Sequence, residues 1–436
     1  MAQTQLPDHP MRYALANELH ARPFPVLQAP CRAMFVAIEK RGTTTEHDRL
    51  ECSAHLAALL DRYGAPRPAP GVDQYSGSLG RGFLKWEMHT EFVTYTIFAA
   101  EPHGEPFSPD LFSLFPRDWL AGAPGRIVTA CMVDVETVAP DEREDYMNRH
   151  FPGWFVPESL AVSVVSDDSA VVAGDFRIDE HGHVRFAILA HPEATSSRLG
   201  RIVQRVLEIE TYKSMAMLSL PTAREVSRTV ARLDRELAEN AAGMAQESNE
   251  AAQVLHRLLA MTAEIEALSS ATAFRFGAFE AYEAIVTHRI AALRERRVAD
   301  QQLLGEFMMR RFDPAMRTCR SAKGRLAELS GRAERAANLL RTRVDVSNQE
   351  QNVQILKAMD RRAALQLRLQ ETVEGLSVVA ISYYAVNLAA GLFGPLGYGL
   401  GLDKTDMVAL LTIPVVAAVW FGLRRLKHRM EGGEGD

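Results

Sequence analysis

The chain has 436 residues, of which 47% are apolar and 24% charged, and its formal net charge is −6 at pH 7. This length exceeds one compact core, so we expect two or more units, and the composition is that of a folded protein. The acidic balance argues against a general nucleic-acid binder, which would show a basic footprint.

The cysteines and the N-terminal residues indicate a cytosolic setting for the first part of the chain. No two of the four cysteines have metal-finger or CxxC spacing, so ordinary reduced thiols are expected. The opening "MAQTQLPDHPMRYALANELHARPF" lacks the apolar core of a secretory signal. We therefore expect the N-terminal part to stay in the cytoplasm.

Residues 31–195 carry the patterns of short β-strands. The joins "HTE" at 89–91 and "DEHG" at 179–182 are typical of hairpins, and the stretch 44–64 has helical spacing. Over residues 1–195 we predict a cytosolic α/β domain with a mostly antiparallel sheet, so the fold class is α+β. The expected strands are rich in Val, Ile, Thr and aromatic residues: "CRAMFVAIE", "GFLKWEMH", "EFVTYTIFAA", "RIVTACMVDV", "LAVSVVS", "AVVAGDFRI" and "HVRFAILAH".

Helical patterns replace the strand patterns from Ser196 onward. The first helix begins with serines suited to cap it, and its apolar residues recur on one face. Pro221 interrupts this pattern, and residues rich in Ala, Arg, Glu and Leu follow. We predict a helical layer over 196–312, with two or more antiparallel helices after the proline.

A very long helix is predicted to begin at Asp313 as N-cap, with Pro314 at the first helical position. The simplest interpretation is one helix of about 80 residues, roughly 120 Å, with a stalk over 313–375 that continues into a membrane. Two helices broken near Gly324 or Gly331 are the alternative. A helix of this length needs partners, from its own chain or from copies. A packing seam is indicated by Leu326, Leu329, Ala333, Ala336, Leu340 and Val344.

Two uncharged stretches near the C-terminus are long enough to cross a bilayer. Residues 376–396 would form a helix of roughly 31 Å, and residues 407–423 one of about 25 Å. Pro414 in the second stretch is tolerated better in a membrane helix than in a soluble one. Two buried core helices are the alternative, but tandem uncharged segments flanked by charge are uncommon in soluble cores.

The charges beside these stretches predict their orientation. Arg361, Arg362 and Arg368 precede the first stretch, and the tail 424–436 is basic at its start, whereas the connecting loop carries two acids and one lysine. Positive charge stays on the cytoplasmic side. We therefore expect a multi-pass protein of the inner, cytoplasmic membrane with both termini in the cytoplasm.

The opening motif "HPMRYALANELHARPF" at 9–24 resembles an uncharacterised bacterial family of membrane-anchored proteins, domain of unknown function 3422. The length and the two C-terminal stretches agree with that family. The resemblance implies a membrane anchor and no particular activity.

The order of parts also resembles CorA-type magnesium channels. "AAGLFG" at 389–394 and the tail "RRLKHRM" are similar to segments of that family. In those channels an asparagine of a Gly-Met-Asn signature helps bind a hydrated cation at the pore mouth. The aligned residues here are Gly394, Pro395 and Leu396, so the glycine is retained and the asparagine is replaced. This departure argues against magnesium selectivity.

A pore built from several copies needs polar groups that face its axis. Asn387 is the candidate, because Ser382 is offset from it by about 140° on a straight helix; a hydrogen bond between helices is the alternative role. Gly391 and Gly394 are further pore-lining candidates, or else sites of close helix packing. Two acids of the connecting loop, Asp403 and Asp406, are candidates for the outer mouth of the pore, where they would concentrate a divalent cation. The alternative is that both are ordinary solvated loop acids.

Glu18, His20 and Arg22 form the polar centre of the N-terminal motif. They would either line a ligand or anion pocket or brace the segment against the sheet through a buried salt bridge. His181 and His183 have metal-like spacing, but they flank a tight turn without a second ligand pair. For these two we predict a solvated hairpin tip.

No P-loop, GxSxG elbow or HExxH motif occurs, so we expect no enzyme and no cofactor beyond a possible divalent cation. Two functions remain. One is a homo-oligomeric, CorA-like cation channel or transporter. The other is a membrane-anchored sensor or scaffold without transport. The expected partners are the lipid bilayer and copies of the same chain.

Overall fold

The computed structural model describes residues 8–18, 24–40, 46–100, 105–243, 251–398 and 403–431. The chain divides into two compact units. Residues 1–245 and 256–337 form the N-terminal unit, and residues 246–255 and 338–436 form the C-terminal unit.

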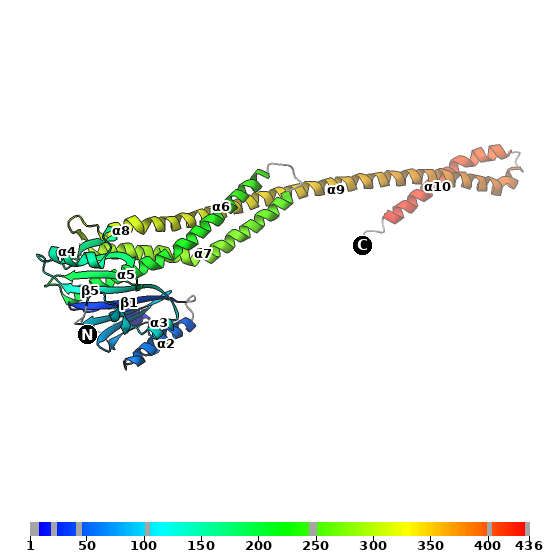
Figure 1. Ribbon diagram of the computed structural model, residues 1–436. Coiled ribbons are helices and arrows are strands. Elements are labelled where there is room, and N and C mark those ends of the chain that lie inside the picture. Colours follow the sequence, from blue (N-terminus) through cyan, green and yellow to red (C-terminus); the bar gives the residue numbers. More distant parts are fainter. Residues whose placement is uncertain are drawn as a thin grey trace. The chain divides into compact units, whose positions relative to one another are not determined.

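A nine-stranded sheet lies at the centre of the N-terminal unit (Figure 1). Its order is β2-β3-β4-β1-β5-β8-β7-β6-β9, and only β5 and β8 pair in parallel. The mostly antiparallel sheet, its seven expected strands and both hairpins are confirmed. The bounds are β1 Cys31–Lys40, β2 Gln74–Leu79, β3 Gly82–Met88, β4 Phe92–Ala100, β5 Gly125–Thr137, β6 Ala161–Val165, β7 Ala170–Ile178, β8 Val184–Ala190 and β9 Arg296–Arg297.

The sequence did not reveal β2 and β9. The β2 stretch "QYSGSL" is rich in serine and glycine, which are poor strand formers, and β9 has two residues. Both strands exist because a neighbour offers them an edge: β2 pairs with β3 and β9 with β6.

Helices cover both faces of the sheet. Alternate residues of β1, such as Met34 and Val36, join a core with the helices of one face, while α5 packs over the other face, where Glu210 accepts a hydrogen bond from Thr129 of β5. The expected helix at 44–64 is confirmed as α2. The covering elements are α2 Glu46–Arg62, η1 Pro109–Leu114, α3 Arg117–Ala121, α4 Arg143–Trp154 and η2 Pro157–Ser159 on the first side, with α1 Arg12–Glu18 preceding β1 and α5 Ser196–Met217 on the second side.

A helical layer continues the N-terminal unit after α5. Ion pairs join its helices to the start of α9 Asp313–Tyr398: Lys323 of α9 meets Glu280 of α7 at 2.8 Å, and Arg332 of α9 meets Asp234 of α6 at 2.5 Å. The expected helices after α5 are therefore confirmed. Their bounds are α6 Ser219–Gly243, α7 Ala251–Leu293 and α8 Leu304–Arg311.

Three predicted helix boundaries were slightly wrong. The residue that caps α5 is Thr195 rather than a serine, and its side chain makes no capping bond. The helices α5 and α6 separate at Leu218, one turn before Pro221, which fits inside the first turn of α6 where its missing amide costs nothing. The carbonyl of Phe312, not Asp313, accepts the first amides of α9.

The predicted long helix is confirmed. α9 runs from Asp313 to Tyr398 as one helix of 86 residues, with Gly324 and Gly331 inside it. In its first part Leu326, Leu329, Ala333 and Leu340 are buried, as the predicted seam requires, whereas Ala336 and Val344 are only half-buried. α10 spans Lys404–Glu431 with Pro414 inside it, and residues 399–402 of the expected loop lie outside the described residues.

Candidate functional site

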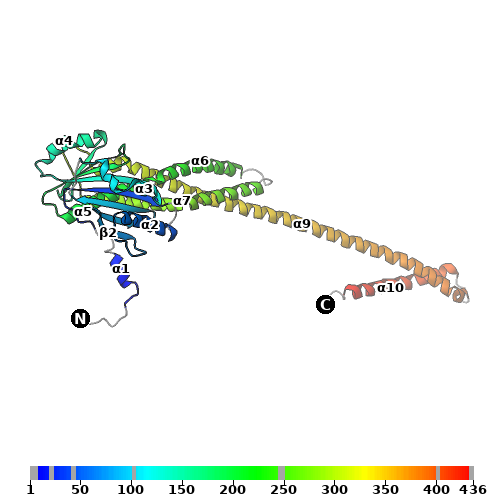
Figure 2. The ribbon, with the colours of Figure 1, turned by 60° about the horizontal axis from the view of Figure 1, so that its bottom comes forward.

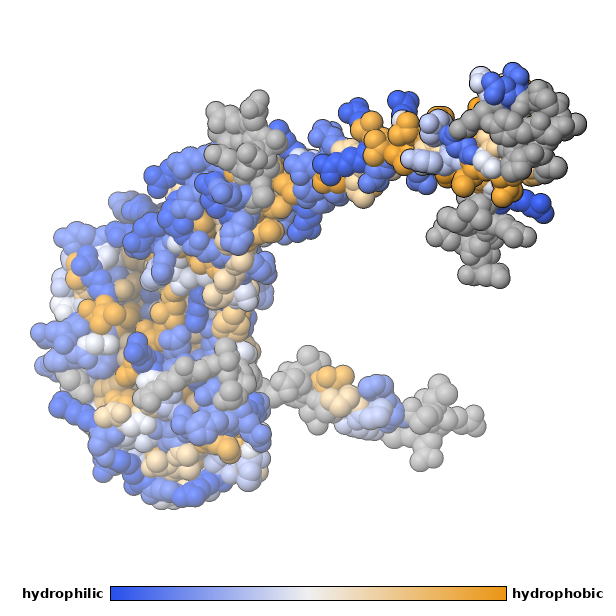
Figure 3. Space-filling view, turned by 90° about the vertical axis from the view of Figure 1, so that its right-hand side faces the viewer, coloured by the Kyte–Doolittle hydropathy of each residue, from blue (hydrophilic) through white to orange (hydrophobic). Residues whose placement is uncertain are grey.

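The C-terminal unit carries two uncharged helical stretches at its surface. Two helices are long and apolar enough to cross a membrane by length and composition, one within 304–393 and one within 405–425. In the most apolar segment of each helix, only 17% and 6% of the residues are buried. Leu376, Leu388 and Ile413 are 73%, 75% and 78% exposed, and Figure 3 shows apolar side chains, in orange, at this surface. These stretches are therefore not buried core helices of the described chain.

One face of α9 is covered and another is open. Ser382, Val386 and Ala390, spaced by four residues, are buried. α10 follows α9 in the same unit and lies beside its end (Figures 1 and 2). Asn387 and Gly391 are exposed. The offset between Ser382 and Asn387 that the sequence predicted is thus present in the helix.

The open face is a continuous stripe, which we call the α9 stripe. Its members recur every three or four residues and fall within an arc of about 80° on a helix of 3.6 residues per turn. Leu369 is 69% exposed and Tyr383 67%. The α9 stripe consists of Leu365, Leu369, Val373, Leu376, Ala380, Tyr383, Asn387 and Gly391, all exposed in the single chain.

The polar candidates of the first span lie on this stripe. Asn387 donates a hydrogen bond of 2.9 Å from Nδ2 to the carbonyl of Tyr383, one turn earlier. A side-chain amide also carries an acceptor oxygen, which remains for a further partner. A Cβ at Gly391 would meet no atom within 4 Å, so this glycine leaves room for a close neighbour. Gly394 lies in α9, but its surroundings are outside the described part.

The two acids of the expected outer mouth begin α10. The carbonyl of Asp403 accepts the amides of Asp406 and Met407 at 3.1 and 3.2 Å. Both aspartates are exposed. Negative side chains in the first turn stabilise a helix through its dipole, so a structural role accounts for both residues. A role at a pore mouth stays a prediction.

The side chains of the polar centre of the N-terminal motif lie outside the described part of the chain. Glu18 ends α1, described by its backbone alone, and His20 and Arg22 lie outside the described residues. The residues that follow, 24–28, form a strap on α5, in which Leu27 donates its amide to the carbonyl of Ser196 at 3.1 Å.

The prediction of a solvated hairpin tip was wrong for His183. Its ring is buried, with its centroid 4.0 Å from that of Phe112, and burial lowers its pKa. His181, by contrast, is exposed. Within the described residues, no three His, Cys, Asp or Glu side chains gather as metal ligands would.

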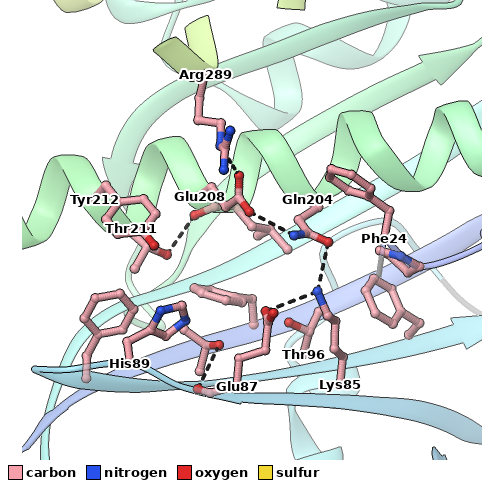
Figure 4. Close-up of a pocket in the computed structure, with 16 residues that line it drawn as sticks. Phe24, Lys85, Glu87, His89, Thr96, Gln204, Glu208, Thr211, Tyr212 and Arg289 are labelled. Atoms are coloured by element: carbon pink, nitrogen blue, oxygen red, sulfur yellow. Dashed lines mark hydrogen bonds and ion pairs between the residues drawn. The ribbon is translucent and has the colours of Figure 1, made fainter. Parts of the chain in front are cut away.

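A cavity of about 180 Å³ lies between the sheet and α5 in the N-terminal unit (Figure 4). Lys85 and Glu87 of β3 enter it from the sheet, Gln204 and Glu208 from α5, and Arg289 from α7. The strap 24–28 lies at its edge through Phe24 and Pro25.

Sequence patterns did not predict this cavity. In "GFLKWEM" the charged residues alternate with Leu84 and Trp86, which is the pattern of a strand with one solvent face. That face is covered by α5, so Lys85 ends with 7% of its side chain exposed and Glu87 with 15%. One feature of the sequence could have indicated the cavity. It is the pair of opposite charges at positions i and i+2 of a strand, with an amphipathic helix later in the chain that can cover them.

Comparison with models of known protein families gives a match over almost the whole chain. The family model described as "Protein of unknown function (DUF3422)" matches residues 7–430. No curated protein and no solved structure matches the chain. The resemblance to CorA-type channels is therefore not confirmed.

Proposed function

The chain belongs to the family of proteins of unknown function DUF3422, and we propose that it is an integral membrane protein whose copies assemble through the α9 stripe into a cation channel. The observation that carries this proposal is the stripe itself. It runs without a charged member from Leu365 to Gly391, and no other segment of the described chain covers it, since all of its members are exposed.

Lipid alone does not account for the stripe. The uncharged segment begins after Glu374, so Leu365, Leu369 and Val373 lie among charged residues, beyond the hydrocarbon core. Acyl chains cover apolar side chains only within that core. A second copy of α9 covers both parts of the stripe at once, and burying such leucines contributes roughly 1.5–3 kcal/mol each.

Assembly on this stripe brings Tyr383 and Asn387 from every copy to one axis. Polar uncharged groups in a membrane helix face other helices or a water-filled path rather than lipid. A ring of asparagine carboxamides offers oxygen atoms to a cation that has kept part of its water shell. Asp403 and Asp406, at the start of α10, add negative charge at the end of the pore where α9 and α10 are connected.

The first experiment tests assembly. The molar mass of the full chain in mild detergent is measured for the wild type and for Leu369→Glu, whose new charge lies on the stripe. The matched control is Leu367→Glu, because Leu367 is 63% exposed and about 160° away on the helix. A mass of several 48.3 kDa chains that only Leu369→Glu reduces is expected. A wild-type monomer ends the proposal.

The second experiment tests conduction. Flux of Mg²⁺, K⁺ and Na⁺ is followed in liposomes that contain the wild type, Asn387→Leu or the control Leu388→Ala. We expect flux in the wild type and the control, and a changed rate or selectivity in Asn387→Leu. Absence of flux for every ion in correctly assembled wild type refutes transport.

The second candidate function is a membrane-anchored sensor or scaffold without transport. It is favoured by one observation, the polar cavity of the N-terminal unit, which transport does not require. An assembled protein that conducts no ion in the liposome experiment would favour this function over transport.

A further inference from the structure

The cavity between the sheet and α5 has the chemistry of a binding site, and it stands apart from the proposed membrane function. Three phenylalanines of the sheet line it, Phe35, Phe92 and Phe98, which we call the aromatic floor, together with charged and polar side chains. Pockets for drug-sized ligands measure roughly 300–1,000 Å³. A cavity of about 180 Å³ therefore suits a small metabolite.

Four charged side chains and one amide form a line across this cavity. Lys85 Nζ lies 3.1 Å from Glu87 Oε2 and 2.9 Å from Gln204 Oε1. Gln204 Nε2 donates to Glu208 Oε1 at 2.8 Å, and Arg289 Nε lies 2.5 Å from Glu208 Oε2. Two cations face two anions, so the line is neutral. A ligand with net charge would add an unbalanced charge to a partly desolvated place, whereas a neutral or zwitterionic ligand would not.

The two ends of the line keep unused bonding capacity. Glu87 meets Lys85 through Oε2 and Arg289 meets Glu208 through Nε, so Oε1 of Glu87 and the Nη groups of Arg289 are the atoms that a ligand would contact. Glu87 comes from the strand and Arg289 from α7, on opposite sides of the cavity (Figure 4). An acceptor for an ammonium group thus stands opposite a planar donor for a carboxylate. The aromatic floor adds a favourable surface for an ammonium group.

We propose that this cavity binds a small zwitterion of the amino-acid or betaine class. Its ammonium group lies toward Glu87 and the aromatic floor, and its carboxylate accepts hydrogen bonds from Arg289. The strap residues Phe24 and Pro25 close the edge over it.

The cavity is also connected to α7 beyond Arg289. Tyr212, which lines it, has its ring 5.5 Å from that of Tyr282 of α7, and the Tyr282 hydroxyl donates to Glu91 Oε1 at 2.7 Å. Ligand binding should therefore slow hydrogen exchange in α7 around residues 282–289, which gives a readout independent of any activity.

The test uses the full chain in detergent. Isothermal titration is done with glycine betaine and with L-alanine, L-serine and L-proline. Acetate, which has only the anionic group, and tetramethylammonium, which has only the cationic group, are the comparison ligands. We expect at least one zwitterion to bind at least tenfold more tightly than either comparison ligand and to protect α7 from exchange.

The variants Glu87→Gln and Arg289→Met should each weaken that binding by about 10- to 100-fold, since each removes a charge-assisted hydrogen bond. Arg289→Lys should recover part of the loss. Lys323→Ala, which removes an exposed ion pair of α9 outside the cavity, is the matched control and should bind as the wild type does. Far-UV circular dichroism verifies that each variant is folded.

Three results overturn the proposal: no zwitterion of the set binds, acetate or tetramethylammonium binds as tightly as the zwitterions, or folded Glu87→Gln and Arg289→Met both bind like the wild type. None of these results bears on assembly or flux, because the α9 stripe contributes no residue to the cavity.

Discussion

The buried ion pair between Arg32 of β1 and Asp134 of β5 gives the sharpest stability prediction. Arg32 Nε lies 2.7 Å from Asp134 Oδ1, and the two side chains are 4% and 2% exposed. Burial raises the pKa of Asp134, and the hydrogen bond from Arg32 offsets part of that rise. In Arg32→Met the carboxyl loses this support and takes up a proton in the folded state.

The proton uptake sets the size of the loss. Neutralising a carboxyl with an unfolded pKa of about 3.9 costs about 1.4 kcal/mol per pH unit above that value. The upper limit is therefore about 4 kcal/mol at pH 7 and about 1.5 kcal/mol at pH 5. Because the folded variant holds a proton that the unfolded chain releases, its stability falls as pH rises. Breaking a buried ion pair in other proteins typically costs about 3–5 kcal/mol, which agrees with the value at neutral pH.

The assay is urea unfolding of the full chain in detergent, followed by tryptophan fluorescence at pH 5 and pH 7. Trp86 and Trp119 are buried in the same unit as the pair and report on its unfolding. The double variant Arg32→Met/Asp134→Leu should regain most of the lost stability, since no charge remains buried. A penalty that is equal at both pH values, or a double variant less stable than Arg32→Met, refutes this reasoning.

Three further predictions concern the same unit. Burial raises the pKa of Cys52 and of Cys319 to about 11 each, so a thiol reagent at pH 7 should label neither in the folded protein and both in urea. Burial lowers the pKa of His55, so the unfolded chain binds a proton below about pH 6.5 that the folded chain refuses; stability should fall from pH 7 to pH 5, and less so in His55→Phe. In Gly200→Ala the new Cβ would lie 1.6 Å from a carbonyl oxygen of the strap, so hydrogen exchange in 24–28 should rise, whereas Gly277→Ala, with open space around it, should leave the strap unchanged.

The sequence predicted the C-terminal half of the molecule well. A helix obeys local rules, so uninterrupted helical spacing after Pro314 was enough to predict α9, and the uncharged stretches indicated the two membrane candidates. The angular offset of Ser382 from Asn387 also followed from helix geometry alone. The partner of each face did not, because that depends on where α10 lies.

The cavity could not be predicted from the sequence, because it depends on contacts between distant segments and not on local rules. Lys85 and Glu87 have the alternation of a solvent-facing strand, and nothing local distinguishes a face covered by water from one covered by α5. Gln204 is 119 residues from Lys85, and Arg289 is farther still. Their meeting depends on sheet order and helix packing across the whole unit.

The sequence by itself determined seven strands, the long helix and the two apolar stretches, because hydrophobic periodicity and the absence of charge act over neighbouring residues. Only the tertiary structure decided which faces are covered, that His183 is buried, and that opposite charges from β3, α5 and α7 meet in one cavity. Those outcomes depend on contacts between distant segments, whose free energy no local pattern contains.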